Sequence, residues 1–298
     1  MDRQHTLRHG DTLAVIQQQG AELSALDAHG HAWLWDAQPS WPRHAPVLFP
    51  IVGRLQQDSL LHDGQRHGMT QHGFARDRAF RWLEREERRC SLELTADTQT
   101  RALYPFDFRL VLEFTVGDAT LRCVATVGNP GQAPLPFSVG AHPAFRWPLP
   151  GCEGRDGHRL RFPDLDTQAL TVSRLRDGLL SGEEETLPIP GDGLPLDTAL
   201  FARDALVFRD LPTRRARFCG PSGAAVDMRW DGYRDFGVWT KPQEAPFLCL
   251  EPWRGHASPA GWEGEFNGKP GIVNLPAGEE ASFTWTVDLV PPGSATAG

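Results

Sequence analysis

The sequence predicts an all-β protein with little helix, built as a large antiparallel β sandwich. Its 30 glycines and 25 prolines recur at short intervals, so few windows could hold a long helix without an interior breaker. Between these breakers lie short runs of apolar and β-branched residues, and several alternate with the period of a half-buried strand. Turn signals at Gly117-Asp118 and Asn129-Pro130-Gly131 separate such runs closely, which indicates consecutive antiparallel strands.

The predicted strands follow in chain order. They are residues 12–17, 91–95, 109–116, 120–127, 205–209, 214–218, 225–230, 247–251 and 282–289. The charged run 81–89 (RWLEREERR) mixes both signs and is predicted to be a solvated strand face. Residues 149–196 are richest in Gly, Pro and charge and are predicted to form long loops at one rim. No abrupt change in amino-acid composition marks a linker between domains. Residues 1–298 are therefore predicted to be a single domain whose tail, 291–298, is frayed.

The net charge and the number and spacing of the cysteines restrict the binding partners and the cellular compartment of the protein. The net charge of −8 and the pI near 5.8 argue against a nucleic-acid partner or an anionic membrane, because the average field repels both. The five cysteines are odd in number, widely spread and never at zinc-ligand spacing, which favours a reducing compartment. The N-terminal MDRQHTLRHGD has no apolar signal-peptide core, and no stretch approaches the roughly 20 apolar residues of a membrane span. We therefore expect a cytoplasmic protein, either a monomer or a homodimer.

Three parts of the chain have sequences that a purely structural role does not explain. They are 49–54 (FPIVGR) with 71–76 (QHGFAR), 140–145 (GAHPAF), and 249–253 (CLEPW). Glu251 ends an apolar run, where a carboxylate is costly unless it has hydrogen-bond partners or a chemical role. His142 lies in a rigid turn between small residues and a proline. Each has an ordinary alternative, which is a solvent-exposed strand end for Glu251 and a structural role for His142.

Other chemistries find less support in the residues. Metal catalysis would need His or carboxylate ligands at strand or helix spacing, which the histidines do not supply. A serine hydrolase would need a G-x-S-x-G elbow, and residues 220–223 (GPSG) do not form one. Cys249 lies in an apolar strand and is interpreted as core. The tryptophans beside the candidate segments either stack on a sugar or pack in the core; they are Trp147, Trp239 and Trp253.

Taken together and in this order, FPIVGR, QHGFAR, GAHPAF and CLEPW resemble the aldose 1-epimerase (galactose mutarotase-like) superfamily, closest to its LacX-type branch. The likeness runs from about residue 47 to residue 289. It implies a large antiparallel β supersandwich with an open cleft on one sheet. It also implies catalytic roles for His72, His142 and Glu251, and sugar contacts for Arg54, Arg76, Asp204 and Trp253. Asp197 is close enough in the sequence to compete with Asp204.

The resemblance implies an isomerase that interconverts the α and β anomers of a free hexose, with a small sugar as its partner and with no cofactor or metal. Glu251 would take the proton of the anomeric hydroxyl O1 while His142 protonates the ring oxygen O5, so that the hemiacetal opens. After rotation about the C1–C2 bond, the same pair closes the other anomer.

Two alternatives stay open. A hexose-6-phosphate mutarotase would need cationic groups around the phosphate, for which the candidates are Arg54, Arg76, Arg146 and Arg254. A noncatalytic sugar-binding protein on the same fold would not need an acid and a base. A glycoside hydrolase would need two opposed carboxylates, and only Glu251 is a strong candidate.

Overall fold

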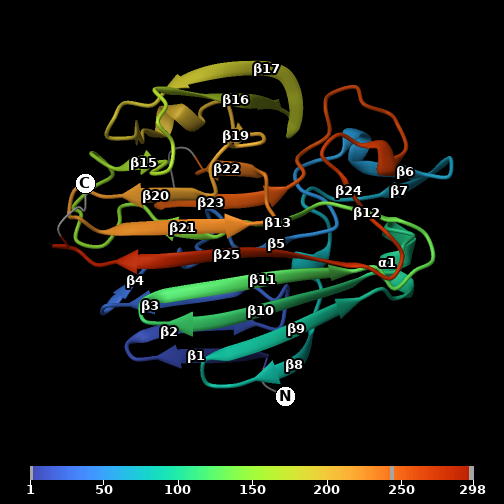
Figure 1. Ribbon diagram of the computed structural model, residues 1–298, viewed down its shortest axis with the longest axis horizontal. Coiled ribbons are helices and arrows are strands. Elements are labelled where there is room, and N and C mark those ends of the chain that lie inside the picture. The colour runs from blue at the N-terminus through green and yellow to red at the C-terminus, as the bar shows by residue number, and fades with distance from the viewer. Residues whose placement is uncertain (1–2, 242–244, 295–298) are drawn as a thin grey trace.

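The computed structural model describes residues 3–241 and 245–294, whose regular secondary structure is almost entirely antiparallel β-strand (Figure 1). The all-β prediction is confirmed. Within these ranges the only α-helix is α1 (Thr98–Leu103), which Asp97 caps by accepting a hydrogen bond from the Thr100 N–H. Short 3-10 turns occur at η1 (Gln56–Asp58), η2 (Ala75–Asp77), η3 (Thr198–Phe201) and η4 (Phe266–Gly268). None of the described helices has the length and apolar character needed to cross a membrane.

The larger sheet contains nine strands within the described residues. In spatial order they are β18 (Leu194–Pro195), β15 (Arg159–Arg161), β20 (Arg215–Cys219), β21 (Ala225–Asp231), β25 (Glu280–Val290), β11 (Thr120–Gly128), β10 (Arg109–Gly117), β9 (Arg89–Thr95) and β8 (Arg81–Arg85). The alternation read from the sequence is realised here, because Leu110, Leu112 and Phe114 of β10 are buried while the residues between them reach the surface. Every residue of β8 also reaches solvent, so the predicted solvated strand face exists.

A second sheet, of eight strands in the described part of the chain, carries the candidate site. Its order is β17 (Leu179–Pro188), β16 (Ala169–Arg176), β19 (Leu206–Phe208), β22 (Asp235–Trp239), β23 (Phe247–Arg254), β13 (Val139–Ala141) and β5 (Val47–Leu48), with β14 (Ala144–Arg146) also paired to β23. Both faces of β23 are covered. Leu248 and Leu250 point into the main core, so Cys249, Glu251 and Trp253 point to the opposite face.

The remaining strands complete the sandwich. A sheet of β1 (Gln4–His9), β2 (Thr12–Gln17), β3 (Leu23–Ala28) and β4 (His31–Ala32) lies against β10. Two two-stranded sheets pair β12 (Leu135–Phe137) with β24 (Val273–Leu275) and β6 (Ser59–His62) with β7 (Gln65–Gly68). One apolar core runs through these layers, with Leu7 from β1, Leu112 from β10 and Leu250 from β23 in the same cluster. The core supports the second sheet from behind and leaves its other face free for a site.

The prediction of long loops over residues 149–196 is wrong. This segment contains β15, β16, β17 and β18. The charges that suggested loops form ion pairs between β16 and β17, as between the buried Arg174 and Glu185 at 2.8 Å and between the exposed Arg176 and Glu183 at 2.6 Å. Charge on both sides of a strand therefore concealed the strand pattern.

The turn at Asn129 and the first residues of the C-terminal tail differ from what the sequence predicted. Gly117 and Asp118 turn β10 into β11, as expected for consecutive antiparallel strands. The turn at Asn129 leads instead to β12, which pairs with β24 and not with β11, so the expectation fails there. At the other end, the Gly293 N–H donates to the Ser222 carbonyl at 2.8 Å. The first part of the tail is thus tied to a loop, and residues 295–298 lie outside the described residues.

Candidate active site

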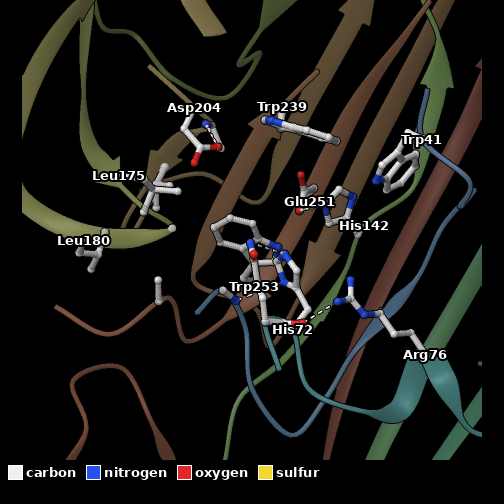
Figure 2. Close-up of a pocket in the computed structure, with 16 residues that line it drawn as sticks. Trp41, His72, Arg76, His142, Leu175, Leu180, Asp204, Trp239, Glu251 and Trp253 are labelled. Atoms are coloured by element: carbon white, nitrogen blue, oxygen red, sulfur yellow. Dashed lines mark hydrogen bonds and ion pairs between the residues drawn. The ribbon is translucent and has the colours of Figure 1, made fainter. Parts of the chain in front are cut away.

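A cleft with a volume of about 370 Å³ opens on the face of the second sheet that carries Glu251 (Figure 2). The predicted site residues that line it are His72, Arg76, His142, Asp204, Glu251 and Trp253. They come from segments far apart in the sequence, and the sheet brings them together. Arg54 is not among the lining residues.

Glu251 and His142 form the centre of the cleft. His142 Nε2 lies 3.1 Å from Glu251 Oε2. The two strands that flank His142, β13 and β14, both pair with β23, so the turn between them is held beside Glu251. Only 7% of His142 and 1% of Glu251 is exposed to solvent. The contact does not have hydrogen-bond geometry, and within the described residues Glu251 Oε2 and His142 Nδ1 have no hydrogen-bond partner.

Burial shifts both pKa values towards the neutral forms. Loss of hydration raises the pKa of Glu251 well above its usual value, and the nearby Asp204 carboxylate raises it further. The indole N–H of Trp253 acts in the opposite direction, although it forms no hydrogen bond of good geometry within the described residues. Loss of hydration also lowers the pKa of His142 to about 3. Over a wide range of pH the pair therefore carries one proton.

His72 presents a fixed donor to the cleft. Its backbone is left-handed, with φ of 66°, and its N–H donates to the Gly53 carbonyl at 2.8 Å. The Gly53 N–H donates in return to His72 Nδ1 at 3.2 Å, so the ring proton must be on Nε2. Burial, followed by the neighbouring His142 and Arg76, lowers the pKa of His72 well below its usual value. Nε2 of this neutral ring lies 3.4 Å from the Gln71 side-chain amide, which also lines the cleft, and its N–H is suited to donate a hydrogen bond to a sugar oxygen there.

Arg76 supplies a positive charge at the same end of the cleft. Its Nη2 donates to the Gln71 carbonyl at 2.6 Å, while its Nε is buried and has no hydrogen-bond partner among the described residues. Burial and then the charge of Arg43 lower the pKa of Arg76 to about 10, so the guanidinium remains charged at neutral pH. Because Arg76 lines the cleft and its only hydrogen bond among the described residues comes from Nη2, its Nη1 is free for an oxygen ligand.

Arg54 lies outside the cleft, contrary to the sugar contact that the resemblance implied. Its guanidinium binds Asp58 in a bidentate pair at 2.6 and 2.7 Å and donates to the Asp177 carbonyl at 3.0 Å. Asp177 is in the β16–β17 turn, whose Gly178 packs against the Arg54 side chain. Arg54 therefore fixes this turn at the edge of the cleft.

The same edge is held by backbone hydrogen bonds between distant segments. The Ser258 N–H donates to the Arg54 carbonyl at 2.9 Å, and the Leu180 N–H donates to the Ser258 carbonyl at 2.9 Å. The Ala260 N–H donates back to the Leu180 carbonyl at 2.8 Å. Leu175, Gly178 and Leu180 then form an apolar wall of the cleft.

Asp204, and not Asp197, is the aspartate of the cleft. Asp204 has a left-handed backbone with φ of 75° and accepts a hydrogen bond from the Ala205 N–H at 2.7 Å. Asp197 instead caps η3 by accepting from the Ala199 N–H at 2.9 Å, and it does not line the cleft. The sequence alone left these two residues in competition.

Three tryptophans line the cleft. The Trp253 ring lies over the backbone of Gly237 and Gly140, where any Cβ would approach it within 2.4 and 2.7 Å, so only glycine fits beneath it. Trp239, which the sequence placed beside a candidate segment, and Trp41, which it missed, pack around His142. Trp147 is fully buried in the core.

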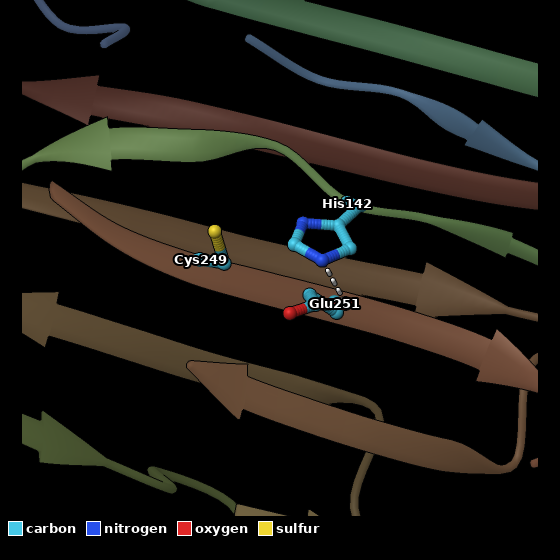
Figure 3. A group of neighbouring side chains, drawn as sticks. All are labelled: His142, Cys249 and Glu251. Carbon is cyan, nitrogen blue, oxygen red and sulfur yellow. Dashed lines mark ion pairs between the residues drawn. The ribbon is translucent and has the colours of Figure 1, made fainter. Parts of the chain in front are cut away.

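His142, Cys249 and Glu251 also form a compact donor group. One ligand atom from each lies within 4.8 Å of the others (Figure 3). Cys249 is buried, as interpreted from the sequence, but it lies on the face of β23 that carries Glu251 and not in the main core.

Comparison with known proteins places this chain in a family. The model of the family described as aldose 1-epimerase matches residues 3–265. The chain belongs to the aldose 1-epimerase family. Its LacX-type resemblance is also confirmed, because it is 28% identical over 246 residues to the plasmid-encoded protein LacX of Lactococcus lactis subsp. lactis, covering 79% of this chain and 82% of that protein.

Solved structures of this family agree with the fold. A galactose mutarotase related enzyme from Lactobacillus acidophilus superposes with a TM-score of 0.89 at 26% identity, covering 97% of this chain and 98% of the other. A galactose mutarotase-like protein from Lactobacillus casei ATCC 334 also gives 0.89 at 26% identity, covering 96% and 100%. The galactose mutarotase-like supersandwich implied by the sequence motifs is therefore the fold of this aldose 1-epimerase family member.

Proposed function

We propose that this protein is an isomerase that interconverts the anomers of a free hexose, with Glu251 as the general base and His142 as the general acid. The observation that carries the proposal is the buried contact of 3.1 Å between the two side chains. A proton that moves from Oε2 to Nε2 leaves a carboxylate and an imidazolium. These are the forms needed to accept the O1 proton and to protonate O5.

The reaction conserves protons and forms no covalent adduct with the protein. Glu251 takes the O1 proton, His142 delivers a proton to O5, and the C1–O5 bond breaks as the C1–O1 double bond forms. Rotation about C1–C2 exposes the other face of the aldehyde. Glu251 then returns its proton to O1 while His142 takes the proton back from the O5 hydroxyl as O5 attacks C1, which closes the ring and leaves the pair ready for another cycle.

The other cleft residues bind and orient the sugar in this proposal. His72 donates from Nε2 to a sugar oxygen, and Asp204 accepts from hydroxyl groups. Trp253 offers an apolar ring for the sugar face. The free thiol state of all five cysteines is consistent with a cytoplasmic enzyme, and we propose a monomer or homodimer that needs no nucleic acid or membrane.

A hexose 6-phosphate is the second candidate substrate, and Arg76 is the observation that favours it. Because O5 faces His142 in the proposed pose, C6 extends to the side of the cleft where Figure 2 draws Arg76. A guanidinium that lines the cleft suits a phosphate oxygen. The net charge of −8 opposes a dianion at long range and favours the free hexose.

Anomer-exchange NMR on the purified protein tests the proposal. We expect faster exchange of galactose or glucose than in buffer alone, before and after treatment with a chelator. No acceleration for any free or 6-phosphorylated aldose, combined with sugar binding, would instead support a noncatalytic sugar-binding protein. A kcat/KM at least tenfold higher for the 6-phosphate would favour the second candidate.

A further inference from the structure

The donor group of His142, Cys249 and Glu251 has a chemistry that anomer exchange does not use. Cys249 and Glu251 are two residues apart on β23, so their side chains leave the same face of the strand. His142 faces them from the turn between β13 and β14 (Figure 3). The proposed reaction needs the carboxyl and the imidazole, but it gives no task to the thiol.

The lone pairs of this group are incompletely satisfied. Glu251 Oε2 is buried and has no hydrogen-bond partner among the described residues, and His142 Nε2 faces it at 3.1 Å. Both side chains are more than nine-tenths buried, and Cys249 is fully buried. Buried polar atoms without partners are costly, and a cation that accepts their lone pairs removes that cost.

The donor set and its spacing select the class of cation. Imidazole, thiolate and carboxylate together suit zinc and its softer relatives, whereas magnesium prefers oxygen ligands alone. Zinc binds nitrogen and oxygen at about 2.0–2.2 Å and sulfur at about 2.3 Å, so neighbouring ligand atoms of a tetrahedral site lie roughly 3–4 Å apart. His142 Nε2 and Glu251 Oε2 are already 3.1 Å apart, and one ligand atom of each of the three residues lies within 4.8 Å of the others, so a small side-chain adjustment brings the sulfur to a zinc ion.

We propose that His142, Cys249 and Glu251 bind a zinc-class divalent cation that inhibits the enzyme. The ion exchanges three of its water ligands for imidazole nitrogen, thiolate sulfur and carboxylate oxygen. The Cys249 thiol loses its proton to the buffer as the metal–sulfur bond forms, and Glu251 releases any proton it holds. The fourth position of the ion faces the cleft, which His142 and Glu251 line. The inhibitory effect rests on the function proposed above, but the binding of the ion does not.

Cobalt(II) is the probe for binding, because its thiolate complex has a charge-transfer band in the near ultraviolet. We expect the purified full-length protein to develop this band on titration with Co²⁺ and to lose it when Zn²⁺ is added. Cys249→Ser should abolish the band and weaken Zn²⁺ binding by at least about 100-fold, since loss of even an outer-shell partner costs 10–100-fold. Cys123→Ser, which alters a buried thiol on β11 in the other sheet, should retain both.

Several results would overturn the site. These are a band that persists in Cys249→Ser, a band that is lost in Cys123→Ser, or no band in the wild-type protein. Circular dichroism checks that Cys249→Ser is folded, and Cys249→Ala replaces it if it is not. His142→Asn provides an independent variant, because it retains the thiol and should still weaken Co²⁺ binding.

Anomer exchange measures the inhibitory effect separately. Micromolar Zn²⁺ should slow exchange, a chelator should restore it, and Mg²⁺ at the same concentration should have no effect. Each variant is compared with its own rate without metal, and Cys249→Ser should lose the response to Zn²⁺. Equal inhibition by Mg²⁺, or Zn²⁺ bound at Cys249 without slower exchange, would contradict the inhibitory role. A cobalt band in a protein with no exchange activity would instead contradict the proposed function and leave the metal site standing.

Discussion

His142 and Glu251 face each other at 3.1 Å because the strands on either side of His142 both pair with the strand that carries Glu251. The distance is therefore set by backbone pairing and not by flexible side chains alone. Burial then favours the neutral form of each group, so one proton serves both. An acid and a base that share one proton are already matched to a reaction that takes one proton and delivers one.

Replacing the base should remove most of the catalysis. Glu251→Gln keeps the shape of the side chain but cannot accept the O1 proton, so kcat for anomer exchange should fall by about 10²–10⁴-fold. Sugar affinity, measured by calorimetry, should change little. Glu263→Gln, at an exposed position, is the control and should behave like the wild type. Near-normal exchange together with lost binding would make Glu251 a ligand and not a catalyst.

The acid should act as one unit with the base. His142→Asn should lower the exchange rate to a similar extent, because it blocks the same ring-opening step. The double variant Glu251→Gln/His142→Asn should lose much less than the product of the two single losses. All rates are taken above the buffer background, since sugars mutarotate without an enzyme. Losses that multiply fully would indicate that the two groups act in separate steps.

Glu251 should also make the fold less stable as the pH rises. Its pKa is raised in the folded protein from an ordinary value of 4.5, so its stabilising contribution is fully present below about pH 4.5 and is lost as the pH rises through the folded pKa. Glu251→Gln cannot ionise and should raise the free energy of unfolding by about 1–3 kcal/mol near pH 8, with almost no gain near pH 4. Urea unfolding at both pH values measures this, and an equal gain at both would disprove the linkage.

Substitutions of Arg76 and Arg54 should distinguish a residue that binds the substrate from one that only supports the cleft. Arg76→Gln should lower kcat/KM for a hexose 6-phosphate by at least about tenfold more than for the free hexose, because only the phosphate needs the charge. Arg54→Gln should leave KM for either sugar within about threefold, since its guanidinium binds Asp58 outside the cleft. A large rise in KM for Arg54→Gln would restore the sugar contact that the motif suggested.

The sequence predicted the strands whose two faces differ. Alternating runs such as 109–116 and 120–127 match β10 and β11 closely because one face is buried. The ten-residue strand β17 was missed because Glu183, Glu184 and Glu185 are consecutive, and their partners lie on other segments. A local pattern cannot reveal pairing that only the folded sheet creates.

The same limit applies to the candidate site. His142 and Glu251 could be singled out because a rigid turn and a carboxylate in an apolar run are both unusual. The direction of the Arg54 side chain could not be predicted, because whether it binds Asp58 or enters the cleft depends on how it packs against Gly178. Trp41 was missed because its segment has no strand pattern, and a hydrogen bond from Trp35 Nε1–H to the Trp41 carbonyl helps to hold it at the cleft.

The backbone bonds at the edge of the cleft have a consequence for local opening. The amides of Leu180 and Ala260 and that of Ser258 are hydrogen-bonded among three segments that are distant in the sequence. No single segment can swing away without breaking the bonds of another. In native-state hydrogen exchange these amides should therefore share one opening free energy, and a bound sugar should slow all of them together.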